Sequence, residues 1–150
     1  MTNHASTDSS LTSSQAQTRA QTDLYDRVAH ETAKGVIYAY STSFGMATKL
    51  LAQPVRGQVE DIYALVRLAD EIVDGVAATA GVPAAEIRRM LDELESETER
   101  AMATGYSTNL IVHAFARTAR ATGITPELTR PFFASMRADI TEATHTPESF

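Results

Sequence analysis

The chain has 150 residues, of which 43% are hydrophobic and 21% are charged, and its formal net charge is −6. This acidic balance argues against a nucleic-acid-binding surface, which normally needs a basic patch, and the lack of cysteine excludes disulfides and thiolate metal sites. No apolar run approaches the ~18 residues of a membrane span, and the N-terminus lacks the apolar core of a secretory signal, so we expect a single-domain cytoplasmic protein.

Residues 1–22 are rich in Ser, Thr, Gln and Ala and contain almost no large apolar side chain. Such a composition buries too little surface to offset the entropy of ordering the chain, so we predict a disordered tail here. A transit peptide is a weaker alternative, because Arg19 is the only Lys or Arg in the segment. The folded domain is then expected to span residues 23–150.

Helical periodicity dominates the rest of the chain, and no strand-like alternation competes with it. The predicted helices cover residues 23–34, 36–53, 58–74, 83–103 and 109–122, and a last helix begins at Thr125-Pro126 and carries Phe132, Phe133, Met136 and Ile140. Gly35, Pro54, Gly75, Gly105 and Gly123 are the expected breaks, and Thr108 is an expected N-cap. Residues 141–150 show no obvious element. We therefore predict an all-α fold.

The segment YALVRLADEIVDG, residues 63–75, has an unusual helical pattern. At about 100° per residue, its polar residues Tyr63, Arg67, Asp70 and Asp74 fall within roughly 60° of one another. Apolar residues cover most of the remaining circumference. An ordinary surface helix shows the inverse, a single apolar stripe with a broad polar face. We therefore predict a buried helix whose polar stripe (Tyr63, Arg67, Asp70 and Asp74) faces an internal cavity.

Two carboxylates spaced i, i+4, Asp70 and Asp74, lie close enough on one helix to share a metal site. Oxygen ligands without Cys or a neighbouring His favour a hard cation such as Mg²⁺, which is usually completed by substrate phosphates. Arg67 then fits as a phosphate clamp or as an ion-pair partner, and Tyr63 as a hydrogen-bonding group. The alternative is an ordinary Arg67–Asp70 pair with Asp74 solvated at the helix end.

A second candidate segment is the run from Tyr40 to Gly45, YSTSFG. Ser41 and Ser43 are about 200° apart on a regular helix, so they face one cavity only if the helix breaks. Hydroxyl side chains and Gly45 weaken the helix here. A break would expose a new helix N-terminus beside the hydroxyls, which is a suitable phosphate cradle. A local kink or cap is the favoured interpretation of the segment taken alone.

The remaining polar residues are weaker candidates for a functional site. Glu71 lies beside the stripe and is an accessory acid in one interpretation. Asp139 lines a cavity in one interpretation and forms a surface pair in the other. His30, His113 and His145 show no metal-ligand spacing and are expected to be ordinary surface or core residues.

Three segments together resemble the squalene/phytoene synthase family of head-to-head prenyl synthases. Residues 63–75 are similar to the family's first aspartate-rich helix, residues 40–51 (YSTSFGMATKLL) to its S-x-S-F segment, and residues 132–140 (FFASMRADI) to its later M-x-M-D helix. Their order and spacing agree with the family over residues 23–150. The chain most resembles the bacterial phytoene synthases.

This resemblance implies an isoprenoid-synthase-type helical bundle around a central cavity that binds two prenyl diphosphates. It implies that Asp70 and Asp74 hold Mg²⁺, with Mn²⁺ as an alternative, and that Phe44 lies against the prenyl chain. It also implies phosphate contacts from Ser41, Ser43, Tyr63 and Arg67. The reaction would join two geranylgeranyl diphosphates to phytoene through a cyclopropyl diphosphate, for carotenoid synthesis.

The chain also departs from the family pattern. The family has a second aspartate-rich motif on a later helix, which these 150 residues lack. It also has Arg-Tyr where this sequence has Thr144-His145. We therefore expect residues 23–150 to be the N-terminal half of a synthase domain that is inactive alone.

Two alternatives accompany the phytoene synthase hypothesis. One is a squalene or dehydrosqualene synthase that uses farnesyl diphosphate, with NADPH required only for squalene. The other is a catalytically dead relative that acts as an assembly scaffold, although its retention of the whole polar stripe counts against this. Peripheral association with a membrane is a further expectation, since the product would be a lipid. The sequence does not indicate an oligomeric state.

Overall fold

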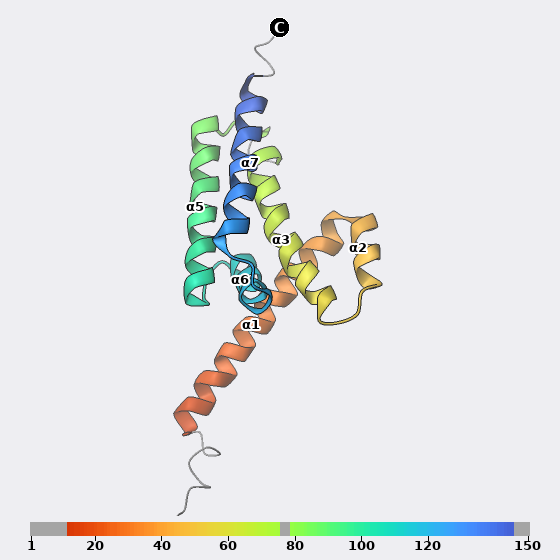
Figure 1. Cartoon of the computed structure of the whole chain (residues 1–150), viewed down its shortest axis with the longest axis vertical. Coiled ribbons are helices and arrows are strands. Elements are labelled where there is room, and N and C mark those ends of the chain that lie inside the picture. Colours follow the sequence, from red (N-terminus) through yellow and green to blue (C-terminus); the bar gives the residue numbers. More distant parts are fainter. Residues whose placement is uncertain (1–11, 76–78, 146–150) are drawn as a thin grey trace, which may run out of the picture.

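The computed structural model describes the backbone of residues 12–75 and 79–145 and the side chains of residues 12–75 and 79–140. Within these ranges the chain forms helices and no strand (Figure 1). The helices are α1 (Ser13–Tyr40), α2 (Thr42–Lys49), α3 (Val55–Asp74), α5 (Ala84–Thr104), α6 (Leu110–Thr122) and α7 (Pro126–His145). The predicted all-α class is confirmed.

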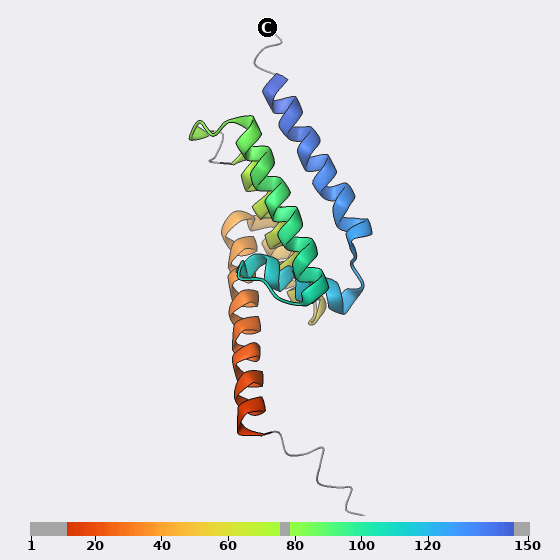
Figure 2. The same cartoon turned by 90° about the vertical axis from the view of Figure 1, so that its left-hand side faces the viewer.

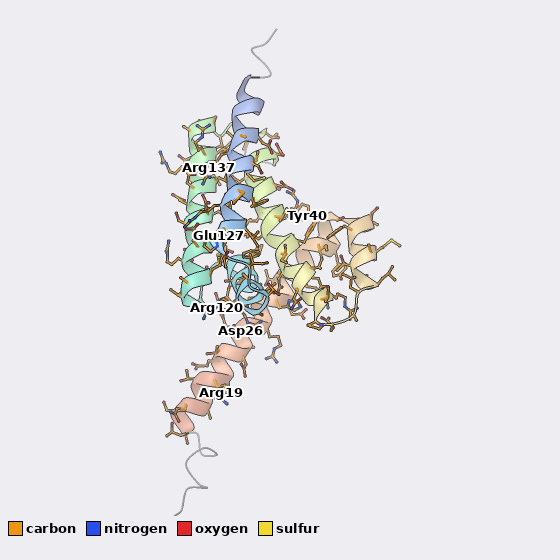
Figure 3. All side chains as sticks on the ribbon, viewed as in Figure 1. Arg19, Asp26, Tyr40, Arg120, Glu127 and Arg137 are labelled. Atoms are coloured by element: carbon orange, nitrogen blue, oxygen red, sulfur yellow. The ribbon has the colours of Figure 1, made fainter. Side chains whose placement is uncertain are left out.

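Helices α3, α5 and α7 run alongside one another, while α6 crosses at one end of this group (Figures 1 and 2). Their main core contains apolar side chains from all four helices, including Leu65, Leu91, Phe115, Phe133 and Met136. Arg137 of α7 reaches α5, where it pairs with Asp92 at 2.7 Å and also with Glu95 (Figure 3). Of the apolar residues predicted on the last helix, Phe133, Met136 and Ile140 are buried and Phe132 packs partly buried against the same core.

Helix α1 packs on α3 and α6 through a second, smaller cluster. This cluster consists of the alanines Ala29, Ala33, Ala64 and Ala114, all fully buried. Small side chains let the helix backbones approach closely. The C-terminal half of α1 is thereby fixed against the helix that carries the polar stripe.

Helix α1 differs from the prediction at both ends. It begins at Ser13, where Thr12 and Gln15 form a capping box, so residues 13–22 are helical and not the predicted disordered tail. The predicted break at Gly35 is also wrong. Ala33 and Ile37 are buried on either side of Gly35, and packing at both positions holds the helix continuous. The prediction for residues 1–11 lies outside the described residues.

Other boundaries differ by a few residues. Asn109, and not Thr108, caps α6, because its side-chain oxygen accepts hydrogen bonds from the amides of Ile111 and Val112. Helix α3 begins at Val55, ahead of the predicted residue 58. Helix α7 contains Pro131 and extends to His145, so the prediction of no element after residue 140 is wrong over 141–145. Within the described residues, no helix is long and apolar enough to cross a membrane.

Candidate functional site

The polar stripe lies along one side of α3, opposite the side that enters the core. Tyr63, Arg67 and Asp70 are half-buried, and Asp74 is exposed at the last residue of the helix. The predicted burial of the whole helix in front of an internal cavity is therefore wrong for the described residues. Only the side that carries Leu65 packs fully, so the stripe remains open to solvent.

Two cavities formed by described residues lie away from the stripe. One, of about 980 Å³, is lined mainly by α1 and α6, including Tyr25 and Arg117. The other, of about 290 Å³, lies between α1, α3 and α6 and is lined by His30 and Asp61, among others. Neither lining includes a residue of the stripe, so neither is the predicted substrate cavity.

The acidic end of the stripe faces a third carboxylate. Burial raises the pKa of Asp70, and the charge of Arg67 lowers it, while the charges of Asp74 and Asp139 raise it further. Asp139 comes from α7, so α3 and α7 together concentrate negative charge at this end. Such a place favours a bound cation, because a cation relieves the repulsion among the carboxylates.

These carboxylates fit Mg²⁺ in their donor type. Asp70 and Asp74 supply the hard oxygen ligands that Mg²⁺ prefers, and Mg²⁺ commonly takes only one or two carboxylates alongside waters and phosphate oxygens. In the described part of the chain, no three His, Asp or Glu side chains are arranged to hold a metal ion by themselves. The site therefore fits a metal that arrives with, or is completed by, a phosphate-bearing ligand.

Arg67 lies at the centre of the stripe and is held in place by two groups. Its guanidinium pairs with Glu71 at 2.9 Å, one turn further along α3. The same guanidinium lies 4.2 Å from the ring centroid of Tyr40, the last residue of α1. The structure thus gives Glu71 the role of Arg67's partner, in place of the alternative Arg67–Asp70 pair. Both contacts limit the rotamers of Arg67 and orient it before any ligand binds.

The single helix predicted over residues 36–53 is wrong, because the chain breaks at Ser41 between α1 and α2. Ser41 is both the C-cap of α1 and the N-cap of α2, and its hydroxyl oxygen accepts a hydrogen bond of 3.1 Å from the Phe44 amide. This agrees with the favoured interpretation of a local cap. Ser43 lies exposed in the first turn of α2. A phosphate contact from either serine remains a prediction.

Phe44 brings the two candidate segments together. Its ring stacks on Tyr63 of α3, with 5.5 Å between centroids and 24° between planes. Tyr40 approaches Arg67 from the same break. Residues about twenty positions apart in the sequence therefore form one surface, with aromatic rings at one end and carboxylates at the other.

We expect Ser41→Ala to lower the free energy of unfolding by about 1 kcal/mol, because the amide of Phe44 loses its cap. Urea unfolding followed by circular dichroism measures this loss. Ser43→Ala is the matched control, because Ser43 is exposed in the same turn. Equal effects of the two substitutions would show that the Ser41 cap does not stabilise the break.

Sequence reasoning missed a polar connection beneath α2. The Tyr38 hydroxyl donates a hydrogen bond of 2.5 Å to Oε2 of Glu60, which is 1% exposed, and this bond raises the pKa of Tyr38. Gly45 of α2 packs on the same ring, where a Cβ would lie 3.1 Å from the ring carbon Cδ1. Lys49 lies 4.8 Å from the ring centroid. Tyr38 therefore links α1, α2 and α3 directly below the break at Ser41.

A second missed connection joins α1, α3 and α6. His30 Nδ1 lies 2.7 Å from Asp61, and the Thr118 hydroxyl donates to the other oxygen of Asp61 at 2.8 Å. His113, which is buried, likewise pairs with Asp26 at 2.7 Å. Both histidines are structural partners of carboxylates, in keeping with their predicted ordinary role. The side chain of His145 lies outside the described residues.

Comparison with known families finds a match over most of the chain. The family model described as squalene/phytoene synthase matches residues 37–150. Neither a search of curated proteins nor a search of solved structures returns a match. The matched range includes the helix break at Ser41, the whole polar stripe and Asp139.

Proposed function

The chain belongs to the squalene/phytoene synthase family, and on that premise we propose that it acts in the head-to-head condensation of two prenyl diphosphates. The observation that carries this proposal is the shared surface of the two segments. Phe44 and Tyr63 stack at one end of it, and Asp70 lies in the field of Asp74 and Asp139 at the other. One end suits an apolar chain and the other suits a metal-bound diphosphate.

In this proposal Asp70 and Asp74 hold Mg²⁺, with Mn²⁺ as an alternative. The metal would neutralise negative charge on the departing diphosphate. Arg67, oriented by Glu71 and Tyr40, would bind phosphate oxygens through its planar set of donors.

Tyr63, Ser41 and Ser43 complete the proposed phosphate contacts. Tyr63 supplies a hydroxyl from the stripe, and Ser43 supplies one from the first turn of α2. Ser41 already accepts a hydrogen bond from the Phe44 amide, so its hydroxyl proton remains available for donation to a phosphate oxygen. The Phe44 ring would contact the prenyl chain and exclude water from the allylic cation that is left when the diphosphate departs.

We propose phytoene, formed from two geranylgeranyl diphosphates, as the product of the complete reaction. Squalene or dehydrosqualene from farnesyl diphosphate is the second candidate, and squalene alone would need NADPH. The residues of the stripe support both candidates equally. An assay of the complete synthase with each diphosphate, with and without NADPH, distinguishes them by product. In the part of the chain that the structure describes, no three acidic or histidine side chains are arranged to hold a metal ion, so we expect turnover to need further metal ligands.

The test of the proposal is binding of a non-hydrolysable prenyl thiodiphosphate, measured by calorimetry with and without Mg²⁺. We expect binding that depends on Mg²⁺, because the repulsion among Asp70, Asp74 and the diphosphate must be neutralised. Binding that is absent in both conditions would favour the scaffold alternative. Equal binding in both conditions would contradict the metal role of the stripe.

A further inference from the structure

Helix α2 is not held in place by a buried apolar face. It stands at one side of the molecule, where it packs on α1 and α3 (Figure 1). Its buried residues are Gly45 and Thr48, whereas Met46 is 66% exposed. The Thr48 hydroxyl is used within the helix, where it donates to the Phe44 carbonyl at 2.7 Å. Because burial of large apolar side chains normally fixes a surface helix, another contact must fix the position of α2.

The ring of Tyr38, in the last turn of α1, is the surface on which α2 rests. A Cβ at Gly45 would lie 3.1 Å from the ring carbon Cδ1, so the lack of a side chain at Gly45 lets the backbone of α2 approach the ring closely. Lys49, in the last turn of α2, lies 4.8 Å from the centroid of the same ring. Tyr38 therefore contacts α2 in two successive turns, and a shift of its ring would move the helix.

Glu60 of α3 fixes the ring of Tyr38 in turn. Its Oε2 accepts the 2.5 Å hydrogen bond from the Tyr38 hydroxyl, and the residue is 1% exposed. Among the described residues, Oε1 of Glu60 has no hydrogen-bond partner, and His30 Nε2 lies 3.6 Å from it, beyond hydrogen-bond distance. The Tyr38 hydroxyl is thus the donor that satisfies this buried carboxylate, and its removal would leave the carboxylate desolvated without a hydrogen bond.

Glu60 also lies on the side of α3 that carries the polar stripe. It precedes Tyr63 by three residues and Arg67 by seven, so it is about 20° from Arg67 around the helix. The same side of α3 therefore holds the Tyr38 ring at Glu60 and presents the stripe in the turns that follow. Phe44 of α2 reaches Tyr63 at the beginning of the stripe, with 5.5 Å between the two ring centroids.

We propose that the hydrogen bond between Tyr38 and Glu60 positions α2 for the candidate site. It keeps Phe44 of α2 against Tyr63 and thereby sets the affinity of the site for a prenyl diphosphate. Tyr38 and Glu60 are positioning residues, because they act on the ligand through Phe44. The effect on affinity rests on the proposed function, whereas the placement of α2 is a property of the protein without any ligand.

The experiment compares Tyr38→Phe with Tyr25→Phe in the full chain. Each substitution removes one tyrosine hydroxyl of α1 that donates a 2.5 Å hydrogen bond, to Glu60 in the first case and to the Ser107 carbonyl in the second. We expect Tyr38→Phe to weaken Mg²⁺-dependent binding of the prenyl thiodiphosphate, measured by calorimetry, by about tenfold. It should also speed amide hydrogen exchange at residues 45–49 by about tenfold. Tyr25→Phe should change neither, because the Tyr25 ring packs on Tyr106, away from α2.

Glu60→Gln is the conservative variant. Its side-chain oxygen can still accept from Tyr38, so binding and exchange should stay within about twofold of the unchanged chain. A loss in Glu60→Gln as large as in Tyr38→Phe would overturn the proposal, because the buried charge and not the hydrogen bond would then hold α2.

Two further results would overturn the proposal. Equal effects of Tyr38→Phe and Tyr25→Phe would show a general loss of stability, and unchanged binding in Tyr38→Phe would show that the bond has no part in the site. If the unchanged chain does not bind the thiodiphosphate, the proposed function fails, and the exchange rates alone decide whether the bond between Tyr38 and Glu60 positions α2.

Discussion

Replacing Asp70 with alanine is expected to weaken Mg²⁺-dependent binding of a prenyl thiodiphosphate by about 100-fold. Asp70 is the half-buried acid of the stripe, and its pKa is raised by burial and by the charges of Asp74 and Asp139, in spite of Arg67. A bound cation would therefore stabilise the ionised form of this carboxylate. Calorimetric titration of the full chain with the thiodiphosphate and Mg²⁺ measures the change.

When no divalent ion is present, the same substitution should leave the stability of the fold unchanged or raise it. Because the folded chain raises the pKa of Asp70, its ionised form costs stability at neutral pH, and Asp70→Ala removes that cost. We expect an equal or higher melting temperature without Mg²⁺, and no further rise when Mg²⁺ and the thiodiphosphate are added.

Asp92→Ala is the control for this pair of measurements, because Asp92 is an exposed acid on α5 paired with Arg137. It should leave binding unchanged. Unchanged binding together with a lower melting temperature in Asp70→Ala would show that Asp70 is a structural residue and not a metal ligand.

The residues that periodicity placed correctly are those whose positions depend on helix geometry alone. Tyr63, Arg67 and Asp70 share one side of α3 because helical spacing fixes their directions whatever surrounds the helix. The break near Ser41 was also predictable, because the hydroxyl side chain competes for backbone hydrogen bonds. The contact of Phe44 with Tyr63 depends on the angle between α2 and α3, and local sequence does not specify that angle.

The missed residues have partners far away in the sequence. Glu60 and Asp61 look like surface acids at the start of a helix, yet both are almost completely buried. The partners of Asp61 are His30 and Thr118, which lie 31 and 57 residues away. No pattern within a single helix indicates such a pairing. Gly35 failed as a break for a related reason, since packing on both sides of it outweighs its weak helix propensity.

The second large effect is expected for Asp61→Ala, which should lower the free energy of unfolding by about 3 kcal/mol. Asp61 is 4% exposed, and its two oxygens contact His30 and Thr118. Removing the carboxylate leaves both partners without their hydrogen bond at the junction of α1, α3 and α6. Urea unfolding followed by circular dichroism measures the loss, and Asp92→Ala should change it by less than about 0.5 kcal/mol.

The pH dependence of stability separates the charge of Asp61 from its hydrogen bonds. Burial raises the pKa of Asp61 above its ordinary value of 3.8, although His30 and Thr118 lower it. The folded chain therefore holds this proton more tightly than the unfolded chain, so the contribution of Asp61 to stability falls as pH rises through the folded pKa and is largest below 3.8. Asp61→Asn keeps the shape but does not titrate, so its loss of stability relative to the unchanged chain should grow as the pH is lowered from neutral towards 3.8, the ordinary pKa of the group. A loss that is constant over this range would show that hydrogen bonding, and not the buried charge, determines what Asp61 contributes.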